Sequence, residues 1–469
     1  MGAHRLIRSP VDPNEPRCSD SLQREPAGHP SAPARLPSSP SRRSTEKHRH
    51  KKGLVSDMSI EEKDTPTQEL QTSSHGSFWE VLGVFTRLGF TSFGGPVAHL
   101  GYFRQEIIVR RKWLDEHAYA DLVALCQFLP GPSSSQIGVS LGIARAGILG
   151  GLAAWLGFTL PSAIALTIFA YVTQGLQGVA NAGWLHGLLI VAVAVVAQAV
   201  WGMARNLCPD RPRATIAIVA AIVALLWPVA AGQVLILALA GLLGWWLFRG
   251  QQTSEAPSLS LKIPRPLALS CWAIFFALLL GLPLLRLFFP IQALALFDSF
   301  FRVGSLVFGG GHVVLPLLQR EVVPPGWLSN DQFITGYAAA QAVPGPLFTF
   351  AAYLGTIMRP APNGWLGAIL ALLGIYLPSF LLLLGILPFW NRLRTLGAVR
   401  AALSGINAAV VGILLAALYQ PIWTGAIHAP VDFAFALLAF ALLAIWKLPS
   451  WLVVLISALL GAALGLLHF

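Results

Sequence analysis

Long apolar runs, interrupted by glycine and proline, dominate the chain beyond residue 77. An apolar run of about 18 or more residues predicts a helix that crosses a membrane. The runs predict thirteen such helices, at 78–100, 118–144, 148–173, 184–204, 214–231, 233–248, 267–289, 291–313, 333–358, 364–389, 402–420, 430–446 and 449–468. The pattern therefore predicts an all-α polytopic membrane protein with broken helices.

The chain contains an internal repeat. Arg87, Phe93-Gly94-Gly95 and Glu106 recur 215 residues later as Arg302, Phe308-Gly309-Gly310 and Glu321. At an offset of 214, Gln127 and Pro130-Gly131-Pro132 recur as Gln341 and Pro344-Gly345-Pro346. Matches in this order indicate two homologous repeats. The predicted organisation is a disordered polar tail at 1–77, a first repeat at 78–248, a linker and connecting helix at 249–290, and a second repeat at 291–469.

The orientation of the repeats is predicted from the number of spans and from loop charges. Six spans in each half and one span between them place the second copy upside down. Positive loops lie on the cytoplasmic side, and the two copies carry them in different loops, with Arg205, Arg211 and Arg213 in the first and Arg392, Arg394 and Arg400 in the second. We therefore expect inverted repeats in a 6+1+6 plan, although the basic segment 104–112 fits parallel repeats better.

Composition narrows the class of protein. The chain is 55% hydrophobic and 11% charged, which excludes a soluble globular protein. Residues 1–77 hold 12 of the 32 Lys and Arg and 10 of the 21 Asp and Glu, which leaves 20 basic and 11 acidic residues in the membrane body. This surplus of positive charge favours an anion as the permeant species. Neither the cysteine spacing nor any other motif predicts a metal, a cofactor or a nucleic-acid partner.

The breaks come in matching pairs, which is typical of a transport site between two repeats. In Pro130-Gly131-Pro132 the second proline suits the first position of a helix, whose free N–H groups and dipole favour an anion. Ser133 and Ser134 then add hydroxyl donors, and Gln127 precedes the turn. The second copy, Pro344-Gly345-Pro346 with Gln341, is followed by fewer donors.

The Phe-Gly-Gly elements let backbone N–H groups approach a ligand closely, because glycine has no Cβ. Gly94 and Gly95, with Gly309 and Gly310 in the second copy, are therefore candidate binding residues. The structural alternative for these glycines is close helix packing.

Arg87 and Arg302 are candidates for contact with an oxyanion, since guanidinium presents a planar fork of donors. The structural alternative is an ion pair with Glu106 or Glu321 of the same repeat. These two carboxylates and His312 are candidates for proton coupling. The carboxylates could equally pair with Arg104 or Arg320 at an interface, and an isolated histidine is often structural.

Together, the paired Phe-Gly-Gly and Pro-Gly-Pro blocks over residues 78–469 resemble the chromate ion transporters of the chromate transport family, long-chain type. The resemblance implies two fused homologous halves, export of chromate across the plasma membrane driven by the membrane potential or a proton gradient, and resistance to chromate. The implied partners are chromate, the lipid bilayer and a second copy in a homodimer. The tail 1–77 has no counterpart in this pattern.

Three other functions remain open from the residues. Sulfate is a tetrahedral dianion like chromate, so the same donors suit a sulfate or other oxyanion transporter. A membrane enzyme acting on lipid phosphate would use similar anion-binding groups. Such an enzyme needs a nucleophile and a base, and the sequence has no HExxH motif or paired membrane acids to supply them. No motif separates a carrier from an ion channel.

Overall fold

The structure, a computed structural model, describes residues 76–175, 183–227, 230–249, 263–308, 311–393 and 396–467. These ranges are helical and contain no strand. They confirm the predicted all-α fold. The predicted tail lies outside the described residues except for its last two positions, and so does most of the linker that precedes the connecting helix.

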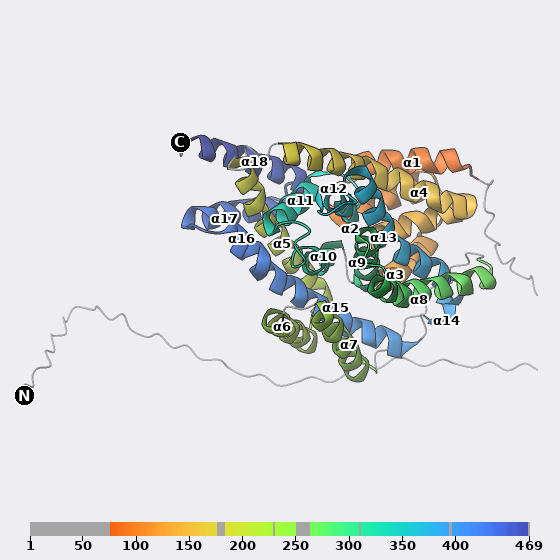
Figure 1. Ribbon diagram of the computed structural model, residues 1–469. Coiled ribbons are helices and arrows are strands. Elements are labelled where there is room, and N and C mark those ends of the chain that lie inside the picture. Colours follow the sequence, from red (N-terminus) through yellow and green to blue (C-terminus); the bar gives the residue numbers. More distant parts are fainter. Residues whose placement is uncertain are drawn as a thin grey trace, which may run out of the picture. The chain divides into compact units, whose positions relative to one another are not determined.

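The first repeat begins with a helix pair that is interrupted between residues 91 and 95 (Figure 1). Its elements are α1 (Phe78–Thr91), α2 (Gly95–Phe103), a π-helical turn (Arg104–Arg110), α3 (Glu116–Phe128), α4 (Ser133–Gly175), α5 (Gly183–Leu207), α6 (Arg211–Leu226) and α7 (Ala230–Leu247). The connecting helix, α8, spans Arg265–Phe288.

The second repeat follows the same order with more short segments. Its elements are α9 (Gln292–Leu306), a 3₁₀ turn (Gly311–Val313), α10 (Val314–Val322), α11 (Asn330–Ala342), a 3₁₀ turn (Leu347–Thr349), α12 (Phe350–Ile357), α13 (Gly364–Ile386), a 3₁₀ turn (Leu387–Phe389), α14 (Trp390–Leu393), α15 (Gly397–Ala417), a π-helical turn (Leu418–Trp423), α16 (Thr424–Ala426), α17 (Pro430–Ala444) and α18 (Ser450–Leu467).

Several predicted single spans are two helices. The run 78–100 forms α1 and α2, and the run 118–144 forms α3 and the start of α4. The run 148–173 forms the second part of α4, which follows non-helical backbone at Ala146 and Gly147. Hydropathy misses these changes because glycine and proline break a helix without lowering the apolar content of the run.

The helices expose large apolar side chains, as lipid-facing helices do. Leu242 of α7, Leu280 of α8 and Leu459 of α18 are 61%, 71% and 62% exposed. Five described helices are long and apolar enough to cross a membrane. Four shorter apolar helices accompany them among the described residues. The chain is therefore a multi-pass membrane protein, while the total of thirteen spans and the inverted orientation stay predictions.

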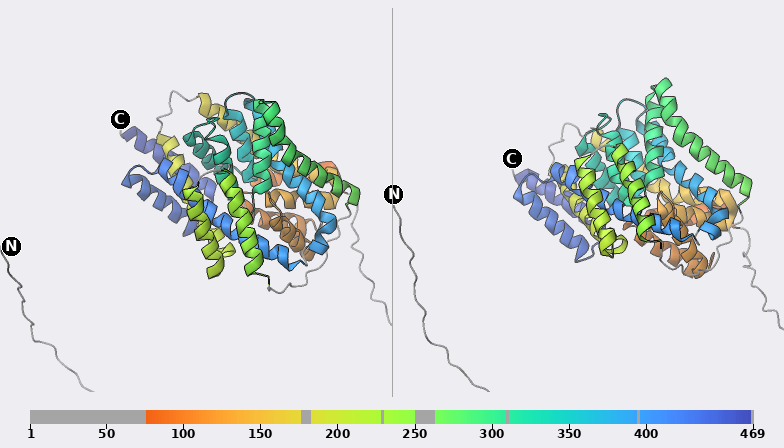
Figure 2. Two further views of the ribbon diagram at one scale, coloured as in Figure 1. Left: turned by 60° about the horizontal axis from the view of Figure 1, so that its bottom comes forward. Right: turned by 90° about the horizontal axis from the view of Figure 1, so that it is seen from below.

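The two repeats exchange helices. α5 of the first repeat packs against α17 and α18 of the second, and α15 of the second packs against α6 and α7 of the first (Figures 1 and 2). Glycines permit both contacts, because a Cβ on Gly187 would overlap Ser457 and a Cβ on Gly405 would overlap Ala240. This reciprocal packing joins the repeats into one helical body.

Candidate functional site

The broken segments turn on glycines with positive φ. Gly94 and Gly95, at the start of α2, have φ of +96° and +78°. Gly131 and Gly345, at the centres of the two Pro-Gly-Pro turns, have φ of +119° and +104°. Backbone in this region strains any residue with a Cβ. The glycines singled out from the sequence therefore shape the turns.

Each Pro-Gly-Pro turn is hydrogen-bonded to the Phe-Gly-Gly segment of the other repeat. The N–H of Gly131 donates to the carbonyl of Val307 over 2.7 Å, and the N–H of Gly345 donates to the carbonyl of Ser92 over 2.9 Å. Val307 and Ser92 are equivalent positions, each immediately before Phe-Gly-Gly. The two repeats thus meet in a pair of matching crossings.

Each turn also packs against the proline-containing helix of the opposite repeat. A Cβ on Gly131 would lie 2.6 Å from the Oγ of Ser379 in α13. A Cβ on Gly345 would lie 2.9 Å from the Oγ of Ser162 in α4. The absence of a side chain at these two glycines is therefore what allows the repeats to approach.

We call the contact of Gly131 with Val307 the first crossing and that of Gly345 with Ser92 the second crossing. A small cavity opens at the second crossing. His312 and Gln341, both from the second repeat, bring polar side chains to its wall. His312 Nδ1 lies 2.7 Å from the hydroxyl of Tyr337, while the side-chain nitrogen of Gln341 has no hydrogen-bond partner among the described residues. The full lining is Gly94, Gly95, Pro96, His312, Ala340, Gln341, Val343, Gly345, Leu347 and Ser450.

The helix starts after the turns differ between the repeats. The sequence predicts Pro132 at the first position of a helix. In the structure it lies one residue before α4, which begins at Ser133. Ser134 is buried at this start. Pro346 precedes a 3₁₀ turn instead of an α-helix. Only the first turn therefore leads directly into an α-helix, and Pro130 and Pro344 lie on the opposite side of the central glycines.

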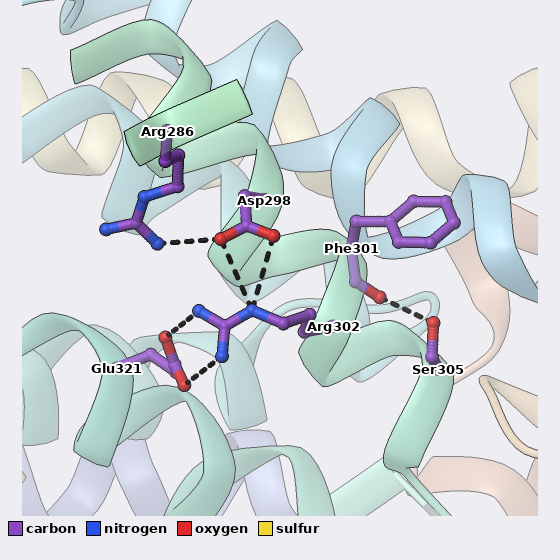
Figure 3. Close-up of polar contacts among 6 residues, drawn as sticks. All are labelled: Arg286, Asp298, Phe301, Arg302, Ser305 and Glu321. Atoms are coloured by element: carbon purple, nitrogen blue, oxygen red, sulfur yellow. Dashed lines mark hydrogen bonds and ion pairs between the residues drawn. The ribbon is translucent and has the colours of Figure 1, made fainter. Parts of the chain in front are cut away.

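Arg302 belongs to a chain of ion pairs (Figure 3). Its guanidinium pairs with Glu321 at 3.0 Å and with Asp298 at 3.3 Å. Asp298 also pairs with Arg286 of the connecting helix at 2.7 Å. The ion-pair alternative for Arg302 and Glu321 is thus what the structure contains, extended by two residues that the sequence reasoning did not single out.

Arg302 and Glu321 line a second, more apolar cavity between α7, α9 and α10. Gln233 of α7 also lines it. With its amide oxygen facing Arg320, Gln233 accepts from that guanidinium at 3.0 and 3.2 Å. Arg320 also donates to the carbonyl of Ala224 at 2.9 Å. Arg302 thus lines this second cavity and not the cavity at the second crossing.

The first-repeat counterparts are arranged differently. Glu106 pairs with Arg111 at 2.8 Å and with Arg110 at 3.2 Å, instead of with Arg87 or Arg104. Arg87 is exposed, and its side chain has no hydrogen bond or ion pair within the described ranges. The expected pairing of the repeated Arg and Glu therefore holds only in the second repeat.

The remaining sequence candidates divide between the crossings and the surface. Gln127 is exposed on α3, whereas its counterpart Gln341 lines the cavity. Gly309 and Gly310 lie outside the described residues. No cluster of three histidine, cysteine, aspartate or glutamate side chains that could hold a metal occurs in the part of the chain that the structure describes.

Some residues at the crossings and in the ion pairs of Arg302 were missed by the sequence reasoning. Ser92 and Val307 act through backbone carbonyls, which leave no signal in side-chain chemistry. Asp298 has Gly83 as its counterpart, so a search for repeated residues passes over it. A search for acidic residues one helical turn before Arg302 would have found it.

Comparison with known proteins identifies the family. The chromate transporter family matches the chain twice, at residues 79–245 and 294–462. The chromate transport protein of Pseudomonas aeruginosa is 29% identical over 346 residues, which are 72% of this chain and 79% of that protein. The chromate transport protein of Cupriavidus metallidurans is 26% identical over 429 residues, 86% of this chain and 98% of that protein.

A probable chromate transport protein of Synechococcus elongatus is 26% identical over 406 residues, which cover 82% of this chain and 95% of that protein. No solved structure matches the chain. The two matches of the family coincide with the two repeats, which confirms the resemblance inferred from the paired motifs. The chain belongs to the chromate transporter family.

Proposed function

We propose that this protein is a secondary transporter that exports chromate across the plasma membrane and thereby confers resistance to chromate. Its membership of the chromate transporter family supports chromate as the substrate. With a negative cell interior, outward movement of an anion is downhill by about 2.3 kcal/mol per charge per 100 mV. Export therefore needs no nucleotide hydrolysis.

The reciprocal crossing of the broken segments is the observation that carries this proposal. Irregular backbone is tolerated at membrane depth where it is buried in protein or lines a wet cavity. Here, glycine turns from one repeat meet the Pro-Gly-Pro turns of the other beside a cavity lined by Gly94, Gly95 and Gln341. Backbone N–H groups, amides and helix starts are donors that suit a tetrahedral oxyanion.

The roles of the charged residues follow from their positions. We place the anion at the crossings. We assign Arg302, which lines the separate cavity between α7, α9 and α10, a role on the path to them, in which the substrate and the carboxylates exchange places at its guanidinium. Arg87 is exposed and suits a first encounter with the anion. Glu106, Glu321 and His312 are the candidates for proton coupling. Glu106→Gln should change the pH dependence of transport if its carboxyl carries the coupled proton, and an unchanged profile would remove it from that role.

Chromate uptake into everted membrane vesicles tests the proposal, because uptake in this orientation corresponds to export from the cell. We expect energised uptake that stops when the membrane potential and proton gradient are collapsed, and that sulfate competes for. Vesicles containing the protein that take up no more chromate than empty vesicles would refute transport. Uptake that persists without energy would indicate a channel.

A matched pair of glycine variants tests the location of the site. Gly95 and Gly326 both have φ of +78°, and a Cβ on either would meet no atom within 4 Å. Gly95 lines the cavity, whereas Gly326 lies in the loop after α10. We expect Gly95→Ala to reduce chromate uptake severalfold and Gly326→Ala to leave it unchanged at equal protein level. Equal uptake by the two variants would move the transport path away from this cavity.

A further inference from the structure

Four buried hydroxyl groups lie where the first Pro-Gly-Pro turn meets α13. They belong to Ser135 at the start of α4, Thr159 further along α4, and Tyr376 and Ser379 on α13, and we call them the hydroxyl cluster. Each residue is at most 2% exposed. None of the four side-chain oxygens has a hydrogen-bond partner outside the cluster among the described residues.

The members of the hydroxyl cluster lie close together. The hydroxyl of Tyr376 interacts with those of Ser135 and Thr159. Ser379 is three residues beyond Tyr376 and therefore shares its face of α13. The two repeats thus contribute two hydroxyls each to one buried place.

Two neighbouring features add donors to this place. The indole of Trp155 lies 5.7 Å from the ring of Tyr376 between centroids, and its Nε1 likewise has no partner in the described ranges. The Oγ of Ser379 reaches the side of Gly131, immediately before the start of α4. A helix start adds partial positive charge, so both the donors and the local electric field favour an anion.

A group of buried hydroxyls that have no partner outside their own cluster indicates a ligand. Buried polar groups without partners are costly, and most buried polar atoms in proteins are paired. Hydroxyls can donate, and an indole N–H can only donate. A guest with several acceptor oxygens and negative charge satisfies them all together. An oxyanion has this chemistry, and the absence of a carboxylate from the cluster leaves nothing to repel it.

The second crossing does not offer the same donors. Ser162, the counterpart of Ser379, donates to the carbonyl of Thr159 at 3.1 Å. Thr349, the counterpart of Ser135, donates to the carbonyl of Pro346 at 2.7 Å. Both hydroxyls are therefore already satisfied by their own segments, and the two crossings differ chemically.

We propose that the hydroxyl cluster at the first Pro-Gly-Pro turn binds the transported tetrahedral dianion, so that the carrier has one high-affinity anion site rather than two equivalent ones. This inference rests on the proposed function. In it, Ser135, Thr159, Tyr376 and Ser379 are binding residues contributed jointly by the two repeats. The cavity at the second crossing is then part of the path and not a second copy of the site.

Conservative removal of single hydroxyls tests this inference. We expect Tyr376→Phe and Ser135→Ala each to raise the KM for chromate uptake about tenfold, because each removes a hydrogen bond to a charged ligand. The matched control is Thr356→Val on α12, which removes a buried hydroxyl that donates to the carbonyl of Ala352 at 2.7 Å. Its KM should stay within twofold of wild type.

A second measurement separates binding from folding and from transport. Chromate, or sulfate as a redox-inert probe, should raise the melting temperature of the purified wild-type protein, and Tyr376→Phe should lose this shift. Without anion, Tyr376→Phe should melt close to wild type, since the lost hydroxyl interacts only with two other hydroxyls of the cluster. An unchanged KM together with an unchanged anion-induced shift would overturn the inference. Wild-type vesicles without uptake would refute the proposed function instead, while the melting shift would still decide whether the cluster binds an anion.

Discussion

The approach of Gly131 to α13 predicts a large and specific effect of a single methyl group. In Gly131→Ala, the added Cβ would lie 2.6 Å from the Oγ and 2.7 Å from the Cβ of Ser379. Positive φ costs a residue with a Cβ about 1–2 kcal/mol, and overpacking adds about 1–3 kcal/mol. We therefore expect the free energy of unfolding to fall by about 2–5 kcal/mol.

The two contributions can be separated by variants. Gly326→Ala carries positive φ in open space, so it should lose only about 1–2 kcal/mol. Ser379→Gly removes the two closest atoms that the new methyl group would meet and leaves the side-chain nitrogen of Gln136 at 3.0 Å. In the double variant we expect a favourable coupling of about 1–3 kcal/mol relative to the sum of the single variants.

The assay is denaturant-induced unfolding of the wild type and the four variants in the same detergent micelles, followed by circular dichroism. Additive effects of Gly131→Ala and Ser379→Gly would refute the close approach of the first turn to α13. A loss for Gly131→Ala no larger than that for Gly326→Ala would refute it as well. Either result would also contradict the close contact between Gly131 and Ser379 on which the first crossing depends.

Two further predictions concern the ion pairs and the exchanged helices. Arg302→Ala should lower the free energy of unfolding by about 3 kcal/mol, because the buried Asp298 loses a partner, whereas the exposed Arg87→Ala should change it by less than about 0.5 kcal/mol; equal losses in denaturant unfolding would contradict the importance of the network. Gly405→Ala should weaken the contact between α15 and α7 by about 1–3 kcal/mol. The control is Gly281→Ala on α8, which should cost no stability because its added Cβ would have no atom within 4 Å. Equal melting temperatures for these two glycine variants would contradict the helix exchange.

The sequence predicts the helical class, the two repeats and the broken segments, because each leaves a local signal. Apolar runs identify the helices, and matched glycines and prolines identify the turns. The sequence does not predict which turn meets which. Gly131 donates to Val307 and not to the Phe-Gly-Gly segment of its own repeat, and two nearly identical motifs give no local reason for that choice.

The charged candidates show a second limit of repeat-based reasoning. Arg87 and Arg302 have the same place in the repeat, yet one is exposed and the other is held by two carboxylates. The difference has two sources: Gly83 gives the first repeat no carboxylate to match Asp298, and Glu106 pairs with Arg110 and Arg111 instead of with Arg87. Function inferred from both copies therefore needs the neighbours one helical turn away, which repeat matching ignores.

The exchange of helices between the repeats has a physical consequence for the site. Because α5 and α15 each pack against the other repeat, neither repeat buries its own interior faces alone, and the crossings of the two turns form only when both repeats are in place. A single repeat would leave the backbone N–H of Gly131 or Gly345 without its carbonyl partner in a membrane, where an unsatisfied backbone group costs several kcal/mol. An anion site assembled from one turn of the first repeat and one helix of the second is thus coupled to the relative position of the repeats, which is the variable that alternating access must change.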